Sequence, residues 1–469
     1  MDWEYLSPLD QILPRMYFGE ILCFPSTDTN LFQLLQQGLS KVAASVPHLT
    51  SFVVHDDARP GNLRLERGRD SIDNILVYGN DPLEKMPDYE NLKRNSFPVF
   101  PQSSLFYPNV PNVSWAAPWP VMRAEVTRVR GGFVLVVLVH HCVFDGVALS
   151  ELLNLWAICC ARHTSAQPPE ISQARLNRKV LQGEGLKQQS SPPADIFKIV
   201  NKQSFLSQTI SLIRQAFNPI LPKPLSPTWP ITLYRLPHDK LQSLKQTLNQ
   251  FAPRFGVRFL STNDVVSALI WSCATMAMST SFQRWNLMSY CSTGVSVNIR
   301  PRIQPRLPDD FIGCAIGVAY VDMARTKLCA AAEMASFESL ARVAAAIRHG
   351  VDGITNEKMR EILNYVDGPE DPRTLQWRPK KLNEFYISSW ANQCIYDADW
   401  GPHIGKCEAL RVAQIALAPM CVILPPRQGL EPKDGQSGDI ELVVSLESLH
   451  MDRFRRSKAM SQFAEIIDC

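Results

Sequence analysis

The feature that most constrains this 469-residue chain is the apolar run from Phe133 to Val139, which directly follows the pair Gly131-Gly132. In the preceding residues, 121–130, apolar and charged side chains are interleaved as in a half-buried strand. The glycine pair can form a two-residue turn because glycine tolerates positive φ. We therefore predict a hairpin over 121–139 whose second arm is buried on both faces inside a sheet.

The buried run ends in two histidines, His140 and His141. Adjacent residues of a strand point to opposite faces, so only one of the two can line a given cavity. Imidazole is the natural general base near neutral pH, and the end of a strand would hold it rigidly beside a cleft. The alternative is that both are ordinary core or surface histidines.

Asp145 and Gly146 complete the pattern HHxxxDG, just before a helix predicted at about 147–162. Asp145 could cap that helix by accepting a backbone N–H, or it could pair with an arginine and fix the turn. The segment VNIRPR offers Arg300 and Arg302, which share a strand face by period two. Gly146 removes side-chain bulk beside the histidine, so a large substrate could approach.

The rest of the chain predicts an α/β or α+β architecture of two similar-sized domains, because strands and helices mix in both halves. A polar stretch with two Pro-Pro pairs, 163–205, is typical of a linker. We place the N-terminal domain at 1–180, the crossover linker at 181–205 and the C-terminal domain at 206–469. Further predicted elements are helices at 261–277 and 331–348, and strands at 294–302, 383–390, 409–424 and 439–446.

Composition excludes several classes of function. The formal net charge of +3 gives no electrostatic reason to expect nucleic acid or an anionic membrane as partner. No stretch approaches the ~18 apolar residues of a membrane span, and the N-terminus lacks a secretory signal. The twelve cysteines contain no CxxC pair, so we expect no metal site and a cytoplasmic protein with free thiols.

Signatures of other catalytic strategies are missing from the sequence, including GxSxG, a Walker loop, GxGxxG after a strand and HExxH. A lone base without a nucleophile, metal or cofactor motif suits direct transfer from an activated acyl donor. The acceptor hydroxyl then supplies the nucleophile.

Residues 140–146 match the HHxxxDG motif of the BAHD acyltransferases, and DADWG at 397–401 resembles their second signature, DFGWG, with two of five positions changed. HHxxxDG alone also occurs in peptide-synthetase condensation domains and chloramphenicol acetyltransferase. Five further stretches resemble family landmarks in the same order: LSPLDQ, STNDVVSALIW, VNIRPRIQPRLPDDFIGC, YISSWAN and GDIELVVSLESLHMDRF. The N-terminal stretch is most similar to the fungal branch that includes trichothecene 3-O-acetyltransferase.

This resemblance implies a chloramphenicol-acetyltransferase-like fold, in which each domain has a mixed sheet flanked by helices and an active channel runs between the domains. It implies an acyl-CoA co-substrate, with acetyl-CoA preferred, and no permanently bound cofactor. The acceptor would be a bulky terpenoid, polyketide or alkaloid alcohol, and the protein a monomer that binds neither nucleic acid nor membrane. The alternatives are a condensation or cyclisation enzyme acting on carrier-bound substrates, and a catalytically altered homologue.

Residue by residue, the resemblance implies that His141 is the base and that Ser388 and Trp390 lie beside the tetrahedral intermediate. For Trp390 the alternative is ordinary interface packing. Asp145 would be structural and paired with Arg300, with Arg302 as the fallback.

The second signature would brace the fold at a distance from the chemistry, through Asp397, Trp400 and Gly401. The phosphates of coenzyme A require cations or helix-start amides. Four residues near a predicted helix start offer them, although exposed solubilising charges explain these residues equally well: Arg254, Arg258, Ser261 and Thr262.

Overall fold

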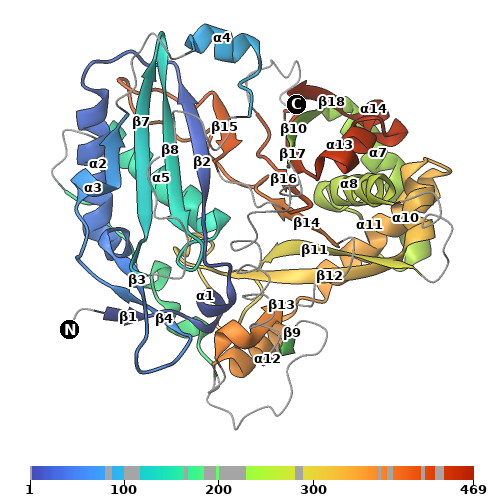
Figure 1. Ribbon diagram of the computed structural model, residues 1–469, viewed down its shortest axis with the longest axis horizontal. Coiled ribbons are helices and arrows are strands. Elements are labelled where there is room, and N and C mark those ends of the chain that lie inside the picture. Colours follow the sequence, from blue (N-terminus) through green and yellow to red (C-terminus); the bar gives the residue numbers. More distant parts are fainter. Residues whose placement is uncertain are drawn as a thin grey trace, which may run out of the picture.

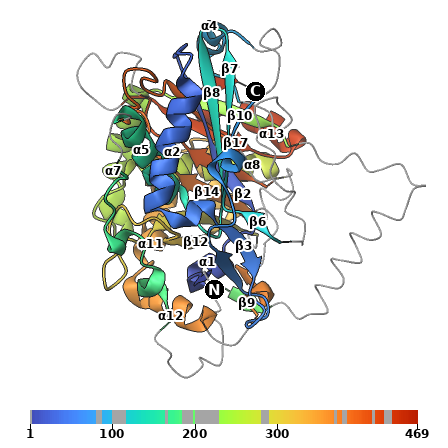
Figure 2. The same cartoon turned by 90° about the vertical axis from the view of Figure 1, so that its left-hand side faces the viewer.

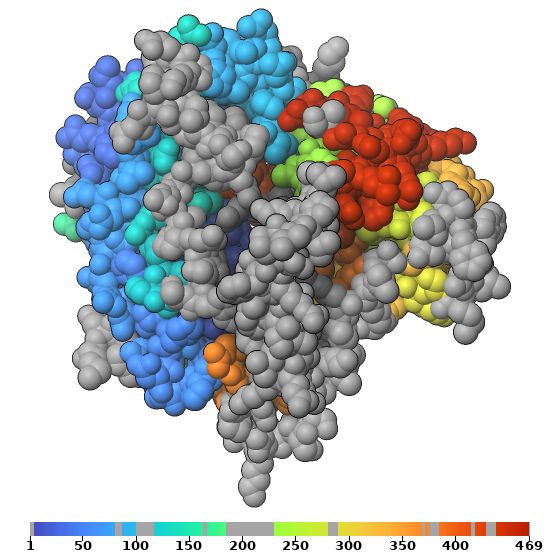
Figure 3. Space-filling model, viewed as in Figure 1, coloured from blue at the N-terminus to red at the C-terminus, as the bar shows by residue number. Residues whose placement is uncertain are grey.

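The fold consists of two lobes, each built around one large sheet (Figure 1). In Figure 3 the surface of the N-terminal lobe is mainly blue to cyan and that of the C-terminal lobe mainly green to red, so each lobe comes largely from one half of the chain. The computed structural model describes residues 3–79, 87–99, 117–162, 167–183, 197–199, 229–279, 289–367, 371–377, 384–413, 418–427 and 438–468.

The N-terminal lobe contains a five-stranded sheet with β8 (Gly132–His140) in its centre. Every residue of β8 is buried, and β8 forms a hairpin with β7 (Met122–Val129) across Gly131, whose φ is +85°. The predicted hairpin is therefore confirmed, but the predicted turn at Gly131-Gly132 is wrong by one residue: Val129 pairs with Gly132, so the turn consists of Arg130 and Gly131. The remaining strands of the sheet are β15 (Ala409–Val412), β2 (Tyr17–Phe24) and β5 (Leu76–Tyr78).

Two helices cover one side of this sheet, α2 (Leu31–Ser45) and α5 (Gly146–Ala161) (Figure 2). They pack against each other, and the indole N–H of Trp156 donates to the carbonyl of Leu35 over 2.8 Å. The strand–turn–helix unit β8–α5 is the frame on which the histidine motif lies.

The C-terminal lobe contains a seven-stranded mixed sheet in the order β12-β11-β14-β16-β17-β10-β18. Strand β14 (Glu384–Ser389) runs parallel to β11 and β16, whereas the other pairs are antiparallel. The other strands are β10 (Ile231–Leu236), β11 (Tyr290–Asn298), β12 (Ile316–Ala324), β16 (Met420–Ile423), β17 (Ile440–Ser445) and β18 (Glu465–Asp468). Helix α8 (Thr262–Met278), which is almost entirely buried, packs against α10 (Arg325–Ala332) and α11 (Phe337–Asp352).

Smaller elements complete the two lobes. A four-stranded sheet contains β1 (Trp3–Tyr5), β4 (Leu63–Glu66), β3 (Phe52–His55) and β6 (Trp119–Pro120), and a two-stranded one contains β13 (Leu375–Trp377) and β9 (Phe197–Ile199). Further helices are α1 (Pro8–Ile12), α3 (Ile72–Ile75), α4 (Tyr89–Arg94), α7 (His238–Asn249), α12 (Asn356–Val366), α13 (Ser448–Arg455) and α14 (Lys458–Phe463). The 3-10 turns within the described ranges are η1 (Pro47–Thr50), η3 (Gln173–Arg175), η4 (Arg178–Leu181), η5 (Ala252–Phe255) and η6 (Pro372–Thr374).

The prediction of one strand over 409–424 is wrong. Residues 409–412 form β15, which pairs with β2 in the N-terminal sheet, while 420–423 form β16 in the C-terminal sheet. Apart from the buried Arg411, both pieces are apolar and largely buried, so the sequence pattern does not reveal that they enter different cores. As a result, the chain from β14 onward returns to the N-terminal lobe before it rejoins the C-terminal one.

The prediction of one helix over 331–348 is also wrong. The chain breaks between α10 and α11, where Met334 has a φ of +54°. Ser336 then caps α11 by accepting the backbone N–H of Ser339 over 3.1 Å. Serine is a preferred N-cap residue, so Ser336 favours the start of a new helix over the continuation of α10.

The predicted linker falls mostly outside the described residues. Its described portions are 181–183 and the short strand β9, which pairs with β13. The domain boundaries at 180 and 206 therefore stay a prediction. Among the helices that the structure describes, none combines the length and apolarity needed to cross a membrane.

Candidate active site

The two adjacent histidines have opposite environments, as the alternation of a strand requires. His140 has no exposed surface and stacks on Trp119 with ring centroids 5.6 Å apart. Tyr17 contacts the same ring edge-on at 5.4 Å. Burial lowers the pKa of His140 to about 3, so this side chain is a neutral part of the core.

His141 lies directly after β8 and remains partly exposed. Its backbone N–H donates to Met16 over 2.8 Å, and its Nδ1 lies 3.3 Å from the carbonyl oxygen of Phe144. This contact assigns the proton to Nδ1, so Nε2 carries the free lone pair. Burial lowers the pKa of His141, while backbone acceptors and Asp145 partly oppose that shift. The ring is therefore neutral at pH 7, the state that a base needs.

Asp145 performs both of its predicted roles at once. Its Oδ1 accepts the backbone N–H of Ala148 over 2.8 Å and so caps α5. Arg300 binds the same carboxylate through two nitrogens at 2.8 and 2.9 Å, and neither side chain is exposed. The N–H of Ala315 adds a further bond of 2.8 Å. The carboxylate thus joins the helix start in one lobe to the β11–β12 connection in the other.

Arg300 reaches Asp145 from a turn and not from a strand face, because β11 ends at Asn298. Its guanidinium also donates to the carbonyl oxygens of Phe311 and Gly313, each over 2.9 Å. Arg302, the fallback partner, points elsewhere and donates to backbone carbonyls near the end of α11. The predicted shared strand face was therefore wrong, although the predicted pair is present.

Trp390 packs the C-terminal lobe against the turn between β8 and α5 that carries His141, which we call the histidine turn. A Cβ placed on Gly146 would lie 3.2 Å from the indole Nε1 of Trp390, so the indole occupies the clearance that we expected a substrate to use. The ring of Phe18 lies 4.5 Å from the ring of His141 and 6.4 Å from that of Trp390. Ser388 is half-buried on β14 and precedes Trp390, which directly follows the strand, by two residues.

Two further polar residues hold this turn, and the sequence reading missed both. Gln393 donates from Nε2 to the carbonyl of Gly146 over 2.8 Å, and its backbone N–H donates to Trp390 over 2.9 Å. Arg178, buried in η4, donates to the carbonyl of Val143 over 3.0 Å. No spacing pattern marks either residue, because each meets the turn from a distant segment.

The second signature lies in the core of the N-terminal lobe. The ring of Trp400 is buried and contacts Phe24 and Trp156, with centroids 5.5 and 5.6 Å apart. Gly401 has a φ of +90°, and a Cβ there would lie 2.7 Å from the Cα of Ala161. These contacts explain why tryptophan and glycine are needed at these positions.

The two departures from the signature are accommodated locally. Ala398 is buried, and the exposed Asp399 accepts the backbone N–H of Gly401 over 2.9 Å, which supports the turn. Asp397 is exposed, and its backbone N–H donates to Cys394 over 3.1 Å.

The four residues considered for coenzyme A gather near the start of α8. Ser261 caps the helix in a box with Asp264, so its hydroxyl is already engaged. Thr262 accepts from Lys245 over 3.1 Å, and Arg254 lies 3.4 Å from Glu338. Arg258 is exposed.

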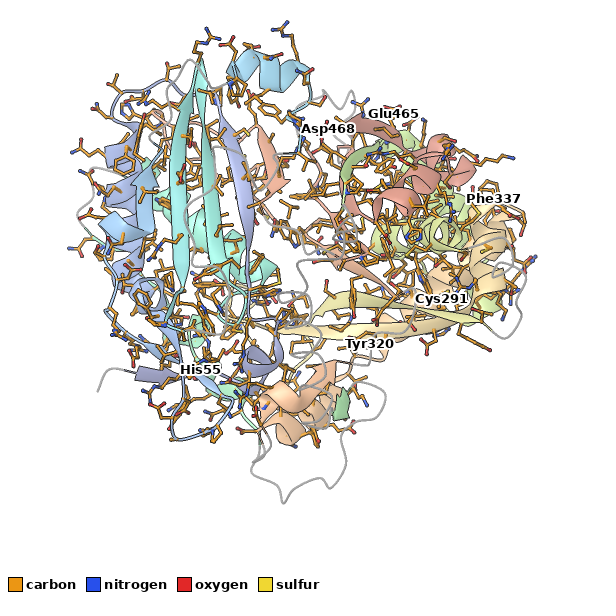
Figure 4. All side chains as sticks on the ribbon, viewed as in Figure 1. His55, Cys291, Tyr320, Phe337, Glu465 and Asp468 are labelled. Atoms are coloured by element: carbon orange, nitrogen blue, oxygen red, sulfur yellow. The ribbon has the colours of Figure 1, made fainter. Side chains whose placement is uncertain are left out.

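A separate cleft of about 480 Å³ opens where β18 approaches the N-terminal lobe. Asp468 accepts the backbone N–H of Val99 there over 2.7 Å, and Figure 4 labels it on the side of β18 that faces the N-terminal lobe. His141 is not among the residues that line this cleft: Arg94, Asn95, Ser96, Pro98, Arg235, Glu465, Ile466, Ile467 and Asp468.

The two-lobed fold and its histidine turn, fixed by a buried carboxylate–guanidinium pair, define the chain as an acyltransferase. The family model described as the transferase family matches residues 3–460. The chain belongs to this family, and the resemblance to the BAHD acyltransferases is confirmed.

Comparisons with individual proteins agree with this assignment. The O-acetyltransferase astG of Aspergillus oryzae is 26% identical over 474 residues, covering 90% of this chain and 95% of that protein. Fumigaclavine B O-acetyltransferase easN of Aspergillus fumigatus is 25% identical, with 95% and 94% covered. The crystal structure of F. graminearum TRI101 with coenzyme A and deoxynivalenol covers 100% of both chains with a TM-score of 0.77 at 18% identity, so the fold is shared.

Proposed function

We propose that this chain transfers an acyl group, acetyl in the first place, from coenzyme A to a hydroxyl of a bulky secondary metabolite. The observation that carries the proposal is the partly exposed His141, whose Nδ1 is engaged by Phe144 and whose Nε2 is left to accept a proton. The names of astG and easN, both O-acetyltransferases, support an acetyl donor and a hydroxyl acceptor. TRI101, solved with coenzyme A and deoxynivalenol, supports an acyl-CoA donor and a bulky acceptor.

In this mechanism the Nε2 of His141 takes the proton of the acceptor hydroxyl as its oxygen attacks the thioester carbonyl. The resulting oxyanion needs hydrogen-bond donors in a dry site. The proposed donors are Trp390, a donor-only indole at the lobe junction, and Ser388, which lies two residues earlier on β14. Collapse of the intermediate breaks the carbon–sulfur bond, and the coenzyme A thiolate recovers the proton from His141.

The remaining residues have supporting roles in this proposal. Asp145 and Arg300 fix the turn that orients the imidazole, and they do not touch the reacting atoms. The second signature, through Asp397, Trp400 and Gly401, braces the N-terminal core. The coenzyme A phosphates would bind at the start of α8 through Arg254, Arg258, Ser261 and Thr262, and the cation Lys245 on Thr262 supports that location.

We further propose a cytoplasmic monomer. A net charge of +3 and an acceptor that is a small molecule give no reason for a nucleic-acid or membrane partner. The acceptor classes that fit are terpenoid, polyketide and alkaloid alcohols.

The experiment mixes purified protein with a panel of acyl-CoA donors and hydroxylated metabolites, and follows thiol release and product mass. His141→Ala should lose activity, whereas the matched control His55→Ala, an exposed histidine on β3 labelled in Figure 4, should keep it. Equal turnover by wild type and His141→Ala would remove the general-base proposal.

A further inference from the structure

A buried arginine from the polar stretch 163–205 binds the backbone of the histidine turn. Arg178, in η4, is 4% exposed, and its Nη2 donates to the carbonyl oxygen of Val143 over 3.0 Å. Val143 lies between His141 and Asp145, so a distant part of the chain reaches the centre of the proposed site. The proposed chemistry gives Arg178 no role.

Acceptors from three other segments surround the Arg178 guanidinium. His48 lies in η1, and its Nε2 is 2.5 Å from Nη1. Burial and the guanidinium both lower the pKa of His48 well below its usual value, so this imidazole is neutral and its Nε2 can accept. Nε of Arg178 lies 3.3 Å from the fully buried carboxylate of Asp10, and Nη1 lies 3.6 Å from Glu4. These positions match the planar fork of an arginine, which a lysine cannot reproduce.

Asp10 belongs to the stretch LSPLDQ, for which the proposed chemistry also gives no role. Its Oδ2 accepts the backbone N–H and the hydroxyl of Ser7 over 2.7 and 2.8 Å, which fixes the carboxylate at the start of α1. The thiol of Cys314, which donates to the carbonyl of His141 over 3.2 Å, lies against the same carboxyl group. Asp10 is therefore next to two of the donors that hold the backbone of the turn, Arg178 and Cys314.

The carbonyl that Arg178 binds is next in the chain to the one that orients the imidazole. Phe144 follows Val143 and supplies the carbonyl oxygen 3.3 Å from Nδ1 of His141. A rotation of the peptide between Val143 and Phe144 would displace that acceptor. The bond from Arg178 to Val143 opposes such a rotation, and it thereby supports the tautomer in which Nε2 of His141 is free.

Arg178 and the Asp145–Arg300 pair hold the turn separately. Arg300 binds the side chain of Asp145, whereas Arg178 binds the backbone two residues earlier. Gly313, in the β11–β12 connection, lies against both arginines: its carbonyl accepts from Arg300 over 2.9 Å, and a Cβ there would lie 3.6 Å from Nη2 of Arg178. A change at Arg178 therefore leaves the ion pair in place, so the effect of the backbone bond can be measured by itself.

We infer that Arg178 is a positioning residue, which with Asp10 as its counter-charge fixes the backbone of the histidine turn and so the orientation of the His141 imidazole. It does not touch the reacting atoms. This inference rests on the proposed function of His141. The polar stretch 163–205 thus contributes a residue to the site, and LSPLDQ contributes the carboxylate that holds it.

The test compares wild type with Arg178→Lys, which keeps a positive charge beside Asp10 but replaces the planar fork by a single ammonium. Its kcat should fall about tenfold or more, because the imidazole is no longer fixed. A relaxed turn admits water to His141, and burial is the largest of the effects on its pKa, larger than the opposing bond to Phe144. That pKa should therefore rise toward 6.5, and the acid limb of kcat should move to higher pH. Wild-type kcat with an unmoved acid limb would overturn the inference.

Arg325→Lys is the matched control. Arg325 is similarly buried, at 3% exposure, and donates to the hydroxyls of Ser289 and Ser279 in the C-terminal lobe. Like Arg178→Lys, this variant should lower the unfolding temperature, but its kcat and its acid limb should stay as in wild type. An equal fall of kcat in both variants would reduce the effect of Arg178 to general destabilisation and would contradict the inference.

NMR titration of isotope-labelled histidine rings tests the inference without any turnover. The His141 signal is identified by its absence from His141→Gln, and its pKa should be higher in Arg178→Lys than in wild type. If wild type transfers no acyl group at all, the proposed function fails separately, and this titration still decides. If Arg178→Lys does not fold, the double variant of Asp10→Asn and Arg178→Met takes its place, because it removes both charges of the buried pair together. An unshifted His141 signal in the folded variant would contradict the inference.

Discussion

Removal of the charge on Asp145 gives the most quantitative test of how the two lobes are joined. In Asp145→Asn the cap on Ala148 can persist through the amide oxygen, but one of the two oxygens that bind Arg300 becomes an NH2 donor. The guanidinium then stays fully buried without its counter-charge. Breaking a buried ion pair in this way costs about 3–5 kcal/mol, so we expect the free energy of unfolding to fall by that amount.

Urea denaturation followed by tryptophan fluorescence measures this change. Arg302→Met is the matched control, because Arg302 also bonds to backbone carbonyls and forms no ion pair at contact distance within the described residues, although Asp352 lies near enough to act on its charge. This variant should cost about 1–2 kcal/mol. Arg300→Met should resemble Asp145→Asn, and the double variant should cost much less than the two singles added, since both break one interaction. If the losses in unfolding free energy of Asp145→Asn and Arg300→Met simply add in the double variant, the two residues do not act as one buried ion pair. A larger loss in Arg302→Met than in Asp145→Asn would also refute that pair's role in joining the lobes.

Three other perturbations have definite expected outcomes. Gly146→Ala places a Cβ 3.2 Å from the indole Nε1 of Trp390 and so displaces the indole. We expect kcat to fall about tenfold or more while the unfolding temperature stays the same, and an unchanged kcat would contradict this prediction. Gly401→Ala meets the Cα of Ala161 at 2.7 Å with a φ of +90°, so thermal unfolding should shift down while kcat of the folded fraction stays the same. Burial raises the folded-state pKa of Glu20 to about 8, so the free energy of unfolding of the wild type should fall between about pH 4.5 and 8, by up to about 5 kcal/mol. Denaturation at several pH values should show a weaker dependence of the unfolding free energy on pH in Glu20→Gln.

The sequence predicts the parts of the fold that depend on local pattern. An uninterrupted apolar run identifies β8 as a central strand, and the Asp145–Gly146 step marks the start of α5. The buried partner Arg300 was also predicted, although from an incorrect strand register. These predictions succeed because neighbouring residues carry the whole signal.

The other features of the fold and the site could not be predicted, because they depend on contacts between residues that lie far apart in the sequence. The strands within 409–424 are apolar except for Arg411, and only the tertiary structure assigns one piece to each lobe. Gln393 is an ordinary polar residue in sequence, and 247 positions separate it from Gly146, whose carbonyl it binds. The sequence predicts that Gly146 leaves room for a substrate, but the indole of Trp390, from the other lobe, occupies that space.

The central claim is that the Nε2 of His141 removes the proton of the acceptor, and the most direct measurement is kcat of His141→Gln against wild type as a function of pH. Because burial keeps the pKa of His141 below its usual 6.5, wild-type activity should be flat at neutral pH and fall only at lower pH as the ring gains a proton. His141→Gln should lose about 10²–10⁴-fold in kcat and show no such acid limb. Undiminished turnover in His141→Gln, with the acid limb intact, would contradict the account.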